Sequence, residues 1–240
     1  MSLQIIDEDQ YTHGVHYKSG AYVLSKKQIG TRYVIAAVRT LVDPSDPEDL
    51  RHVHALQDAM SVTQSNGPGA FQVPRWDLAS QKKVRDALLV LASTLPDTNR
   101  MFGRKEEVDP MRFVIGAAYG WGANPPSEAL YLNVFPASND GTTIYKLHVK
   151  DVPVDGFWSV SVYNADGYFQ INDLNAYSLN NITAKKNADG SIMIQFGGCD
   201  SATPNCLPIM KGWNYMVRLY RPRPAVLNQT WKFPEAEAVS

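Results

Sequence analysis

The sequence has few of the features that usually reveal a protein's partners. Its 240 residues include two cysteines, and 23 basic residues nearly balance 24 acidic ones, which leaves a net charge of −1. The basic residues are scattered and form no stripe that would gather phosphates, so we expect no nucleic-acid partner. The longest apolar stretch, VRDALLVLASTL, is interrupted by polar residues and is shorter than the ~20 residues of a membrane span. We therefore expect no membrane span either.

Signatures of catalysis and export are also absent. The sequence contains no G-x-S-x-G elbow, no P-loop and no dinucleotide-type glycine fingerprint. The first thirty residues lack the basic start and uninterrupted apolar stretch of a secretory leader. We therefore expect the chain as written to be cytoplasmic, and periplasmic or in the cell envelope if an export signal precedes Met1.

The two cysteines, Cys199 and Cys206, lie close together in FGGCDSATPNCLPIM. This spacing suits a disulfide across a loop and a pair of reduced thiols equally well, and a reducing cytosol favours the thiols. A catalytic thiolate needs a nearby base, and every histidine is distant in the sequence. Both structural alternatives remain open at this point.

The composition, with 44% hydrophobic and 20% charged residues, is typical of a folded globular protein. We expect a strand-rich segment over 1–43, the remnant of an N-terminal β domain, then helices over 44–124 and a β-rich domain over 125–240. In the first segment, β-branched and aromatic residues cluster between glycines, which is typical of strands. The expected strands are 2–7, 20–25 and 31–42.

Three helices are predicted in the middle region from their start signals. The first follows Asp46 and the third follows Asp109, two aspartates that can accept hydrogen bonds from the free amides of the first turn, and the second begins near Asp77. The second helix is predicted to end before Pro96, and the third near Trp121. The second also carries an apolar stripe that we expect to be buried: Val84, Leu88, Leu91 and Leu95.

From about residue 128 the apolar residues recur with a period of two. This alternation predicts strands with one face in a core and the other in water. It occurs in four segments: 143–150, 157–164, 191–196 and 213–220. The sequence NADG, at 164–167 and 187–190, is typical of tight turns. We therefore predict a mainly β fold with helices (α+β), ending in an antiparallel, jelly-roll-like β-sandwich over 125–240.

These motifs carry a resemblance to known families. The run GWGANPPSEALYLNVFPASNDGTTIYKLHVKDVPVDGFWSVSVYNADGYF, with NAYSLNN, DGSIMIQFGGC, NCLPI, WNYMVRLYRPRP and TWKFPEA, resembles the C-terminal part of bacterial proteins of domain-of-unknown-function family 1214. The run MSLQIIDEDQY to RYVIAAVRTLVDPSDPEDLRHVHALQDAM is similar to the end of a family 1254 region. The resemblance implies two jelly-roll-like lobes with helices between them and, in many relatives, an export signal. It implies no catalytic residue.

An acidic and histidine-rich cluster near the start suggests a metal site. Asp7 and Asp9 lie two apart in a predicted strand and so share a face, and His13 and His16 follow in a glycine-containing loop. Carboxylates with imidazoles suit zinc, manganese or iron. The alternative is that these acidic residues are simply solvated at a strand end.

Aromatic residues are abundant in the second half, on both faces of the predicted strands. One interpretation is that they are all core. The other is a sheet face or cleft that stacks a flat or sugar-like ligand, with asparagines and an arginine as polar anchors. Its candidate residues are Trp121, Asn133, Phe157, Tyr163, Asn205 and Arg218. If Arg218 is buried, it needs a carboxylate partner such as Glu128 or Asp166.

The function that these observations favour is a noncatalytic binding or structural module for a small or carbohydrate-like ligand, with no cofactor. The alternative is a metal-dependent hydrolase or lyase that uses Asp7, Asp9, His13 and His16 with a divalent ion. If upstream strands are missing, the segments 2–7 and 31–38 present unpaired sheet edges, and we therefore also predict a homodimer.

Overall fold

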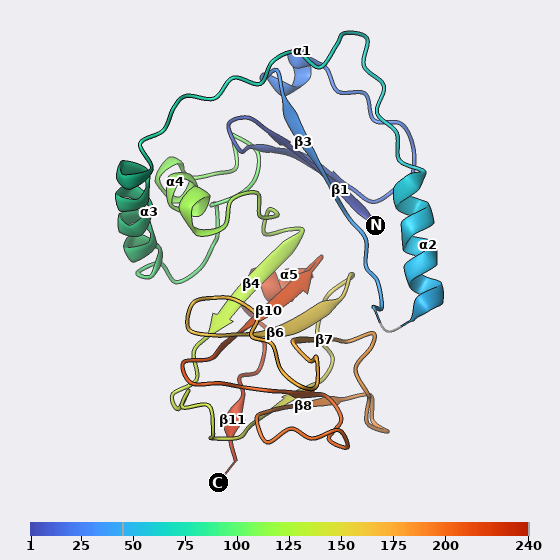
Figure 1. Cartoon of the computed structure of the whole chain (residues 1–240), viewed down its shortest axis with the longest axis vertical. Coiled ribbons are helices and arrows are strands. Elements are labelled where there is room, and N and C mark those ends of the chain that lie inside the picture. The colour runs from blue at the N-terminus through green and yellow to red at the C-terminus, as the bar shows by residue number, and fades with distance from the viewer. Residues whose placement is uncertain (45, 240) are drawn as a thin grey trace. The chain divides into compact units, whose positions relative to one another are not determined.

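The computed structural model describes residues 1–44 and 46–239, and the chain divides into two compact units (Figure 1). Unit 1 comprises Met1–Pro125 and unit 2 comprises Pro126–Ser240. Unit 1 contains a small sheet and most of the helices, and unit 2 is built mainly from two sheets. The predicted mixed α+β fold with antiparallel sheets is therefore confirmed.

The sheet of unit 1 has three antiparallel strands in the order β2-β1-β3. They span Ser2–Asp7 (β1), Thr12–His16 (β2) and Val34–Arg39 (β3). β1 is the central strand, because Ile5 pairs with Gly14 on one side and with Ala36 on the other. The expectation that 2–7 forms a free sheet edge is therefore wrong, since β2 and β3 cover both of its edges.

The prediction of a strand at 20–25 is also wrong. That segment has no regular structure, and Val23 is 85% exposed. The strand that pairs with β1 is instead β2, the histidine-containing segment that had been expected to be a loop. A short apolar run forms a strand only where a neighbouring strand accepts its backbone hydrogen bonds, and β1 is already paired on both sides.

The three predicted helices are confirmed, together with the caps predicted at Asp46 and Asp109; Asp77, where no cap was predicted, is a third. They span Pro47–Asp58 (α2), Leu78–Ala92 (α3) and Pro110–Gly120 (α4), and a single turn, α1, spans Lys26–Ile29. The side chains of Asp46, Asp77 and Asp109 accept hydrogen bonds from the first-turn amides, at 2.9 to 3.0 Å for Glu48, Ala79 and Met111. These caps satisfy donors that have no partner inside the helix.

The buried stripe predicted for α3 is wrong. Leu88 and Leu95 are half-buried against a cluster of Met101, Phe102 and Ile115, but Val84 is 58% exposed and no residue of α3 is buried. α4 is the helix that packs on α3, and one neighbour covers only part of an apolar stripe. The spacing correctly predicts a helix but not how much of it is covered.

Unit 2 consists of two four-stranded sheets with a common core, drawn as two layers in Figure 1. The first sheet has the order β4-β10-β6-β7, with Ala129–Val134, Asn214–Tyr220, Trp158–Tyr163 and Ser178–Asn180. The second has the order β11-β5-β8-β9, with Glu237–Ala238, Tyr145–Val149, Ile192–Phe196 and Cys206–Leu207. All of these pairs are antiparallel except β8 with β9. A short helix, α5, spans Pro224–Leu227.

The core of unit 2 lies between the two sheets. Val160 and Val217 of the first sheet and Leu147 and Ile194 of the second are completely buried. The expected alternation is confirmed in β5, β8 and β10, where buried residues alternate with more exposed ones. Both NADG segments form turns that end in a glycine of positive φ, as expected. The jelly-roll connectivity stays a prediction.

Candidate functional site

The outer face of the first sheet, opposite the core, carries a mixed polar and aromatic surface. In β10, Met216, Arg218 and Tyr220 alternate with the buried residues that face the second sheet. Arg218 lies near the middle of this face, because it is in register with Ser159 of β6 and Tyr131 of β4. The side chains that share this outer face are Tyr131, Asn133, Ser159, Ser161, Tyr163, Met216, Arg218 and Tyr220.

Arg218 is half-buried and is fixed by two hydroxyl groups. Its Nη1 donates to Ser161 Oγ at 2.9 Å, and its Nη2 donates to the Tyr163 hydroxyl at 2.5 Å. The guanidinium carbon lies 5.8 Å from the centre of the Tyr163 ring, within the range of a cation–π interaction. Ser161 Oγ in turn donates to Ser178 Oγ of β7 at 2.9 Å. Three adjacent strands thus position the guanidinium.

Two serines of β6 lie where the alternation had predicted water. Ser161 is 3% exposed, and Ser159 is also buried. The prediction of a solvated outer face for β6 is therefore wrong. Buried hydroxyls need hydrogen-bond partners, and Ser161 obtains them from Arg218 and Ser178.

Aromatic rings lie at both ends of β6. At its C-terminal end, the Tyr163 ring stacks on Phe169 with ring centres 4.9 Å apart and an interplanar angle of 6°, and Phe169 contacts Tyr177 at 5.5 Å. Just before its N-terminal end, Phe157 stacks on Tyr220 at 4.3 Å. Phe169 comes from the loop after β6 and remains 51% exposed. Ring faces of this kind can stack a flat or sugar-like ligand.

The sequence had suggested a carboxylate partner for Arg218, Glu128 or Asp166, but the structure shows hydroxyl partners instead. Among the residues that the structure describes, no carboxylate forms an ion pair with Arg218, and both of its acceptors are hydroxyls. Asp166 is exposed in the turn that follows β6, where its backbone amide donates to Asn164 Oδ1. The guanidinium therefore keeps a formal charge that these contacts leave unneutralised.

The structure brings four of the six predicted ligand-binding residues to this sheet. Tyr163, Arg218 and Asn133 share the outer face, and Phe157 lies at its margin, beside Tyr220. Asn205 is elsewhere, because its side chain bonds the backbone of Lys185 and Met193. Trp121 caps α4 in unit 1. Sequence reasoning missed Phe169, which lies in a loop without periodicity, and Ser161, which alternates with apolar residues as a solvated serine would.

The predicted metal ligands are only partly brought together. Asp7 Oδ2 lies 2.8 Å from His13 Nε2, while Asp7 Oδ1 accepts from the amides of Asp9 and Tyr11. His13 and His16 lie three apart in β2 and so point to opposite faces, and His16 packs on Tyr22. Within the described residues, no group of three or more His, Cys, Asp or Glu is placed to hold a metal ion.

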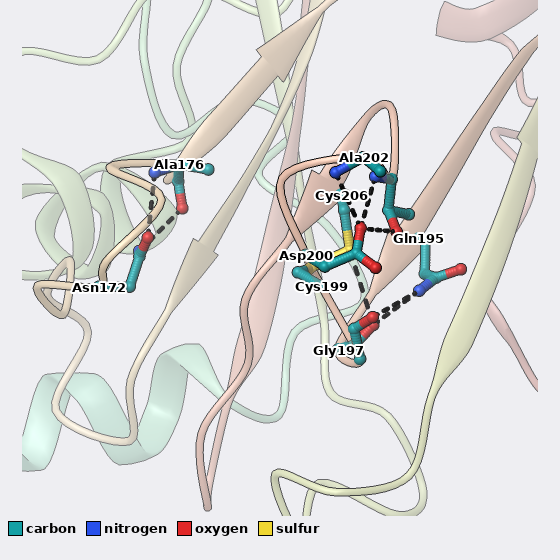
Figure 2. Close-up of a disulfide and its surroundings, with 10 residues drawn as sticks. Asn172, Ala176, Gln195, Gly197, Cys199, Asp200, Ala202 and Cys206 are labelled. Carbon is teal, nitrogen blue, oxygen red and sulfur yellow. Dashed lines mark hydrogen bonds between the residues drawn. A yellow bond between two sulfur atoms is a disulfide. The ribbon is translucent and has the colours of Figure 1, made fainter.

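Cys199 and Cys206 form a disulfide, which resolves the alternatives left open by the sequence. Figure 2 shows it beside Gly197 and the loop of Asp200, whose carboxylate accepts from Thr203 and Ala202. The hydroxyl and amide of Thr203 hold the pKa of Asp200 below its usual range.

A cavity of about 360 Å³, which the sequence had not indicated, borders this bridge. Its lining residues are Gly141, Asn172, Asp173, Leu174, Gly197, Gly198, Cys199, Pro208 and Ile209. The Asn172 side chain bonds both the amide and the carbonyl of Ala176, as Figure 2 shows. The lining thus includes two polar side chains, Asn172 and Asp173, of which Asn172 is already engaged with Ala176.

Comparison with known proteins supports the C-terminal resemblance. Residues 129–224 match the family described as "Protein of unknown function (DUF1214)". The crystal structure of the VPA0106 protein from Vibrio parahaemolyticus is similar over 100% of this chain and 82% of its own, with a TM-score of 0.70 and 20% identity. An uncharacterised protein from Burkholderia cenocepacia matches over 70% of this chain and 44% of its own, with a TM-score of 0.35 and 14% identity. No curated protein matches.

These findings establish the family match of residues 129–224 and a shared fold. The family 1254 resemblance of the N-terminal part stays a prediction. Of the helices in the described part of the chain, none has the length and apolar character that crossing a bilayer requires.

Proposed function

We propose that unit 2 is a noncatalytic module that binds a small, ring-containing ligand on the outer face of the β4-β10-β6-β7 sheet. The observation that carries this proposal is the cluster of Arg218, Tyr163 and Phe169, in which a half-buried guanidinium lies against one ring and a second, exposed ring extends the stack. A flat or carbohydrate-like ligand would stack on the rings and take hydrogen bonds from the polar groups of the face.

The position of this cluster supports a binding role more than a role in folding. The core of unit 2 is complete on the inner side of the sheet, where Tyr215, Val217 and Leu219 are fully buried. A ring that is half exposed, as Phe169 is, gains less stability from its burial than a fully buried ring does. The strands beneath also give the site a rigid base, since Ser161 and Tyr163 belong to β6.

The test is a ligand screen with a matched pair of variants. The unfolding temperature of the protein is followed with sugars, lipids and aromatic acids, and any compound that raises it is titrated against Phe169→Ala and Tyr168→Ala. Tyr168 is the control, because it adjoins Phe169, is 71% exposed and has no ring partner among the described residues. We expect Phe169→Ala to abolish the shift and Tyr168→Ala to retain it. No shift with any compound would contradict the proposal.

We further propose that the protein works in the periplasm or cell envelope. The Cys199–Cys206 bridge supports this location, because disulfides persist in oxidising compartments and are rare in a reducing cytosol. Fractionation of cells, with alkylation of free thiols before lysis, tests it. Protein found in the cytosolic fraction with both thiols labelled would contradict it.

A further inference from the structure

We infer that the ligand of this face carries a carboxylate attached to a ring, and that Arg218 pairs with that carboxylate. The inference rests on the proposed function and narrows it from a ring-containing ligand to an anionic one. It depends on three features of the site: the free donors of Arg218, the charge of the sheet around it, and the hydroxyl of Tyr163.

The first feature is the unused hydrogen-bonding capacity of Arg218. A guanidinium has five N–H donors. Two of them are taken by Ser161 Oγ and by the Tyr163 hydroxyl, and the rest have no acceptor among the described residues. The planar fork of an arginine matches the two oxygens of a carboxylate, and such charge-assisted pairs are about twice as strong as neutral hydrogen bonds.

The second feature is the charge of the sheet. The strand sequences ALYLNV, NYMVRLY, WSVSVY and SLN contain no aspartate, glutamate or lysine, so Arg218 is the one charged residue of the four strands. A half-buried cation loses part of its hydration, and no carboxylate on the same sheet forms an ion pair that would offset this desolvation cost. An anionic ligand would supply the missing counter-charge, and no carboxylate of these strands would repel it.

The third feature is the orientation of the Tyr163 hydroxyl. Its oxygen accepts from Arg218 Nη2, which leaves its own hydrogen available to donate. Ser161 differs, because its hydrogen is already donated to Ser178. Arg218 and Tyr163 can thus donate to the same carboxylate, while Phe169, stacked on Tyr163, offers a ring surface next to it.

Two sources share this chemistry, an aromatic acid and a sugar acid, and matched probes distinguish them. Calorimetric titration compares benzoate with benzamide and galacturonate with galactose. We expect at least one acid to bind, and its neutral counterpart to bind at least about tenfold more weakly, as the loss of a charged hydrogen bond predicts. Which acid binds identifies the source.

Variants of Arg218 connect this preference to the site. Arg218→Gln should reduce the affinity for the acid to that for its neutral counterpart, and Arg218→Lys should give an intermediate value, since it keeps the charge and loses the fork. Arg223→Gln is the control. It removes an arginine of the same unit that pairs with Asp155 on the surface, and it should bind like the wild type. Melting temperatures establish that each variant is folded.

The outcomes separate the two proposals. Equal binding of an acid and its neutral counterpart, unchanged by Arg218→Gln, would overturn the inference and leave the binding function intact. Binding of none of the four probes would count against both. If Arg218→Gln does not fold, the acid and neutral pairs with the wild-type protein and with Arg218→Lys still decide the question.

Discussion

Reduction of the Cys199–Cys206 disulfide should destabilise unit 2 without unfolding it. The bridge joins residues seven apart and connects the Asp200 loop to β9, whose Leu207 is fully buried in the core. A disulfide stabilises a fold mainly by restricting the unfolded chain. The packing of Leu207 and the hydrogen bonds of Asp200 do not depend on the bridge, so we expect the reduced protein to keep its fold.

The expected magnitude follows from loop-closure entropy. For a separation of seven residues, the entropy lost on closing the loop corresponds to about 2.4 kcal/mol at 25 °C. The turn at Asp200, which also orders the loop in the reduced protein, makes this an upper value. A loss of that size should lower the melting temperature of a unit of this length by roughly 7 to 12 °C.

The assay is denaturant unfolding of the wild type and of Cys199→Ser/Cys206→Ala, each with and without a reductant. Alanine is used at position 206 because the side chain there is buried. The reductant should destabilise the wild type by up to about 2.4 kcal/mol and leave the double variant unchanged. A change below about 0.5 kcal/mol in the wild type would refute the entropic reasoning.

The other predictions concern pH and assembly. Burial raises the pKa of Tyr215 above its usual 10.0, so the stability that the neutral hydroxyl contributes is fully present below pH 10 and is lost as the pH rises above it. In pH-dependent unfolding experiments, Tyr215→Phe should remove this alkaline loss. At pH 7 the variant should be less stable by about 1 kcal/mol, because it loses the hydrogen bond from the Ala236 amide. Amide hydrogen bonds from Thr143 and Thr142 lower the pKa of Asp140 from 3.8 to about 2; stability from this group is present above pH 3.8 and is lost as the pH falls towards 2, and Asp140→Asn should flatten that part of the profile. For assembly, light scattering should show a homodimer if the outer edge of β3 pairs with a second copy, and a monomer would contradict that pairing.

Features fixed by local interactions were predicted correctly from the sequence. The caps at Asp46 and Asp109 depend on a side chain and the amides two or three residues later, so a short segment contains all the information. The glycine-ended turns and the strands β5, β8 and β10 are similarly local, because an alternating pattern identifies its own buried face.

Features that depend on distant partners were predicted incorrectly or left open. The segment 20–25 was predicted as a strand and 12–16 as a loop, and only the pairing of 12–16 with β1 shows the reverse. Val84 is exposed although it belongs to an apolar stripe, because coverage depends on the neighbours of a helix and not on its own spacing. The bridge was undetermined for the same reason, since the spacing of Cys199 and Cys206 is compatible with either state.

In the candidate site, too, the features set by local sequence were predictable and those set by distant partners were not. Arg218 and Tyr163 could be placed on one sheet face from the period of their strands, but the register that brings them together is set by the pairing of β6 with β10. Phe169 could not be placed, since a loop has no periodicity to indicate what it contacts. The buried state of Ser161 was hidden for a different reason, because a serine between apolar residues is usually solvated.

The two faces of the β4-β10-β6-β7 sheet differ in what they require of the sequence. On the inner face, shape and apolarity are sufficient, and Val160, Val217 and Leu219 provide both. On the outer face, a cation is held half-buried by two hydroxyls, and no carboxylate among the described residues pairs with it to offset its lost hydration. These contacts alone therefore leave the charge of Arg218 without a counter-charge, which the anionic ligand that we infer would supply.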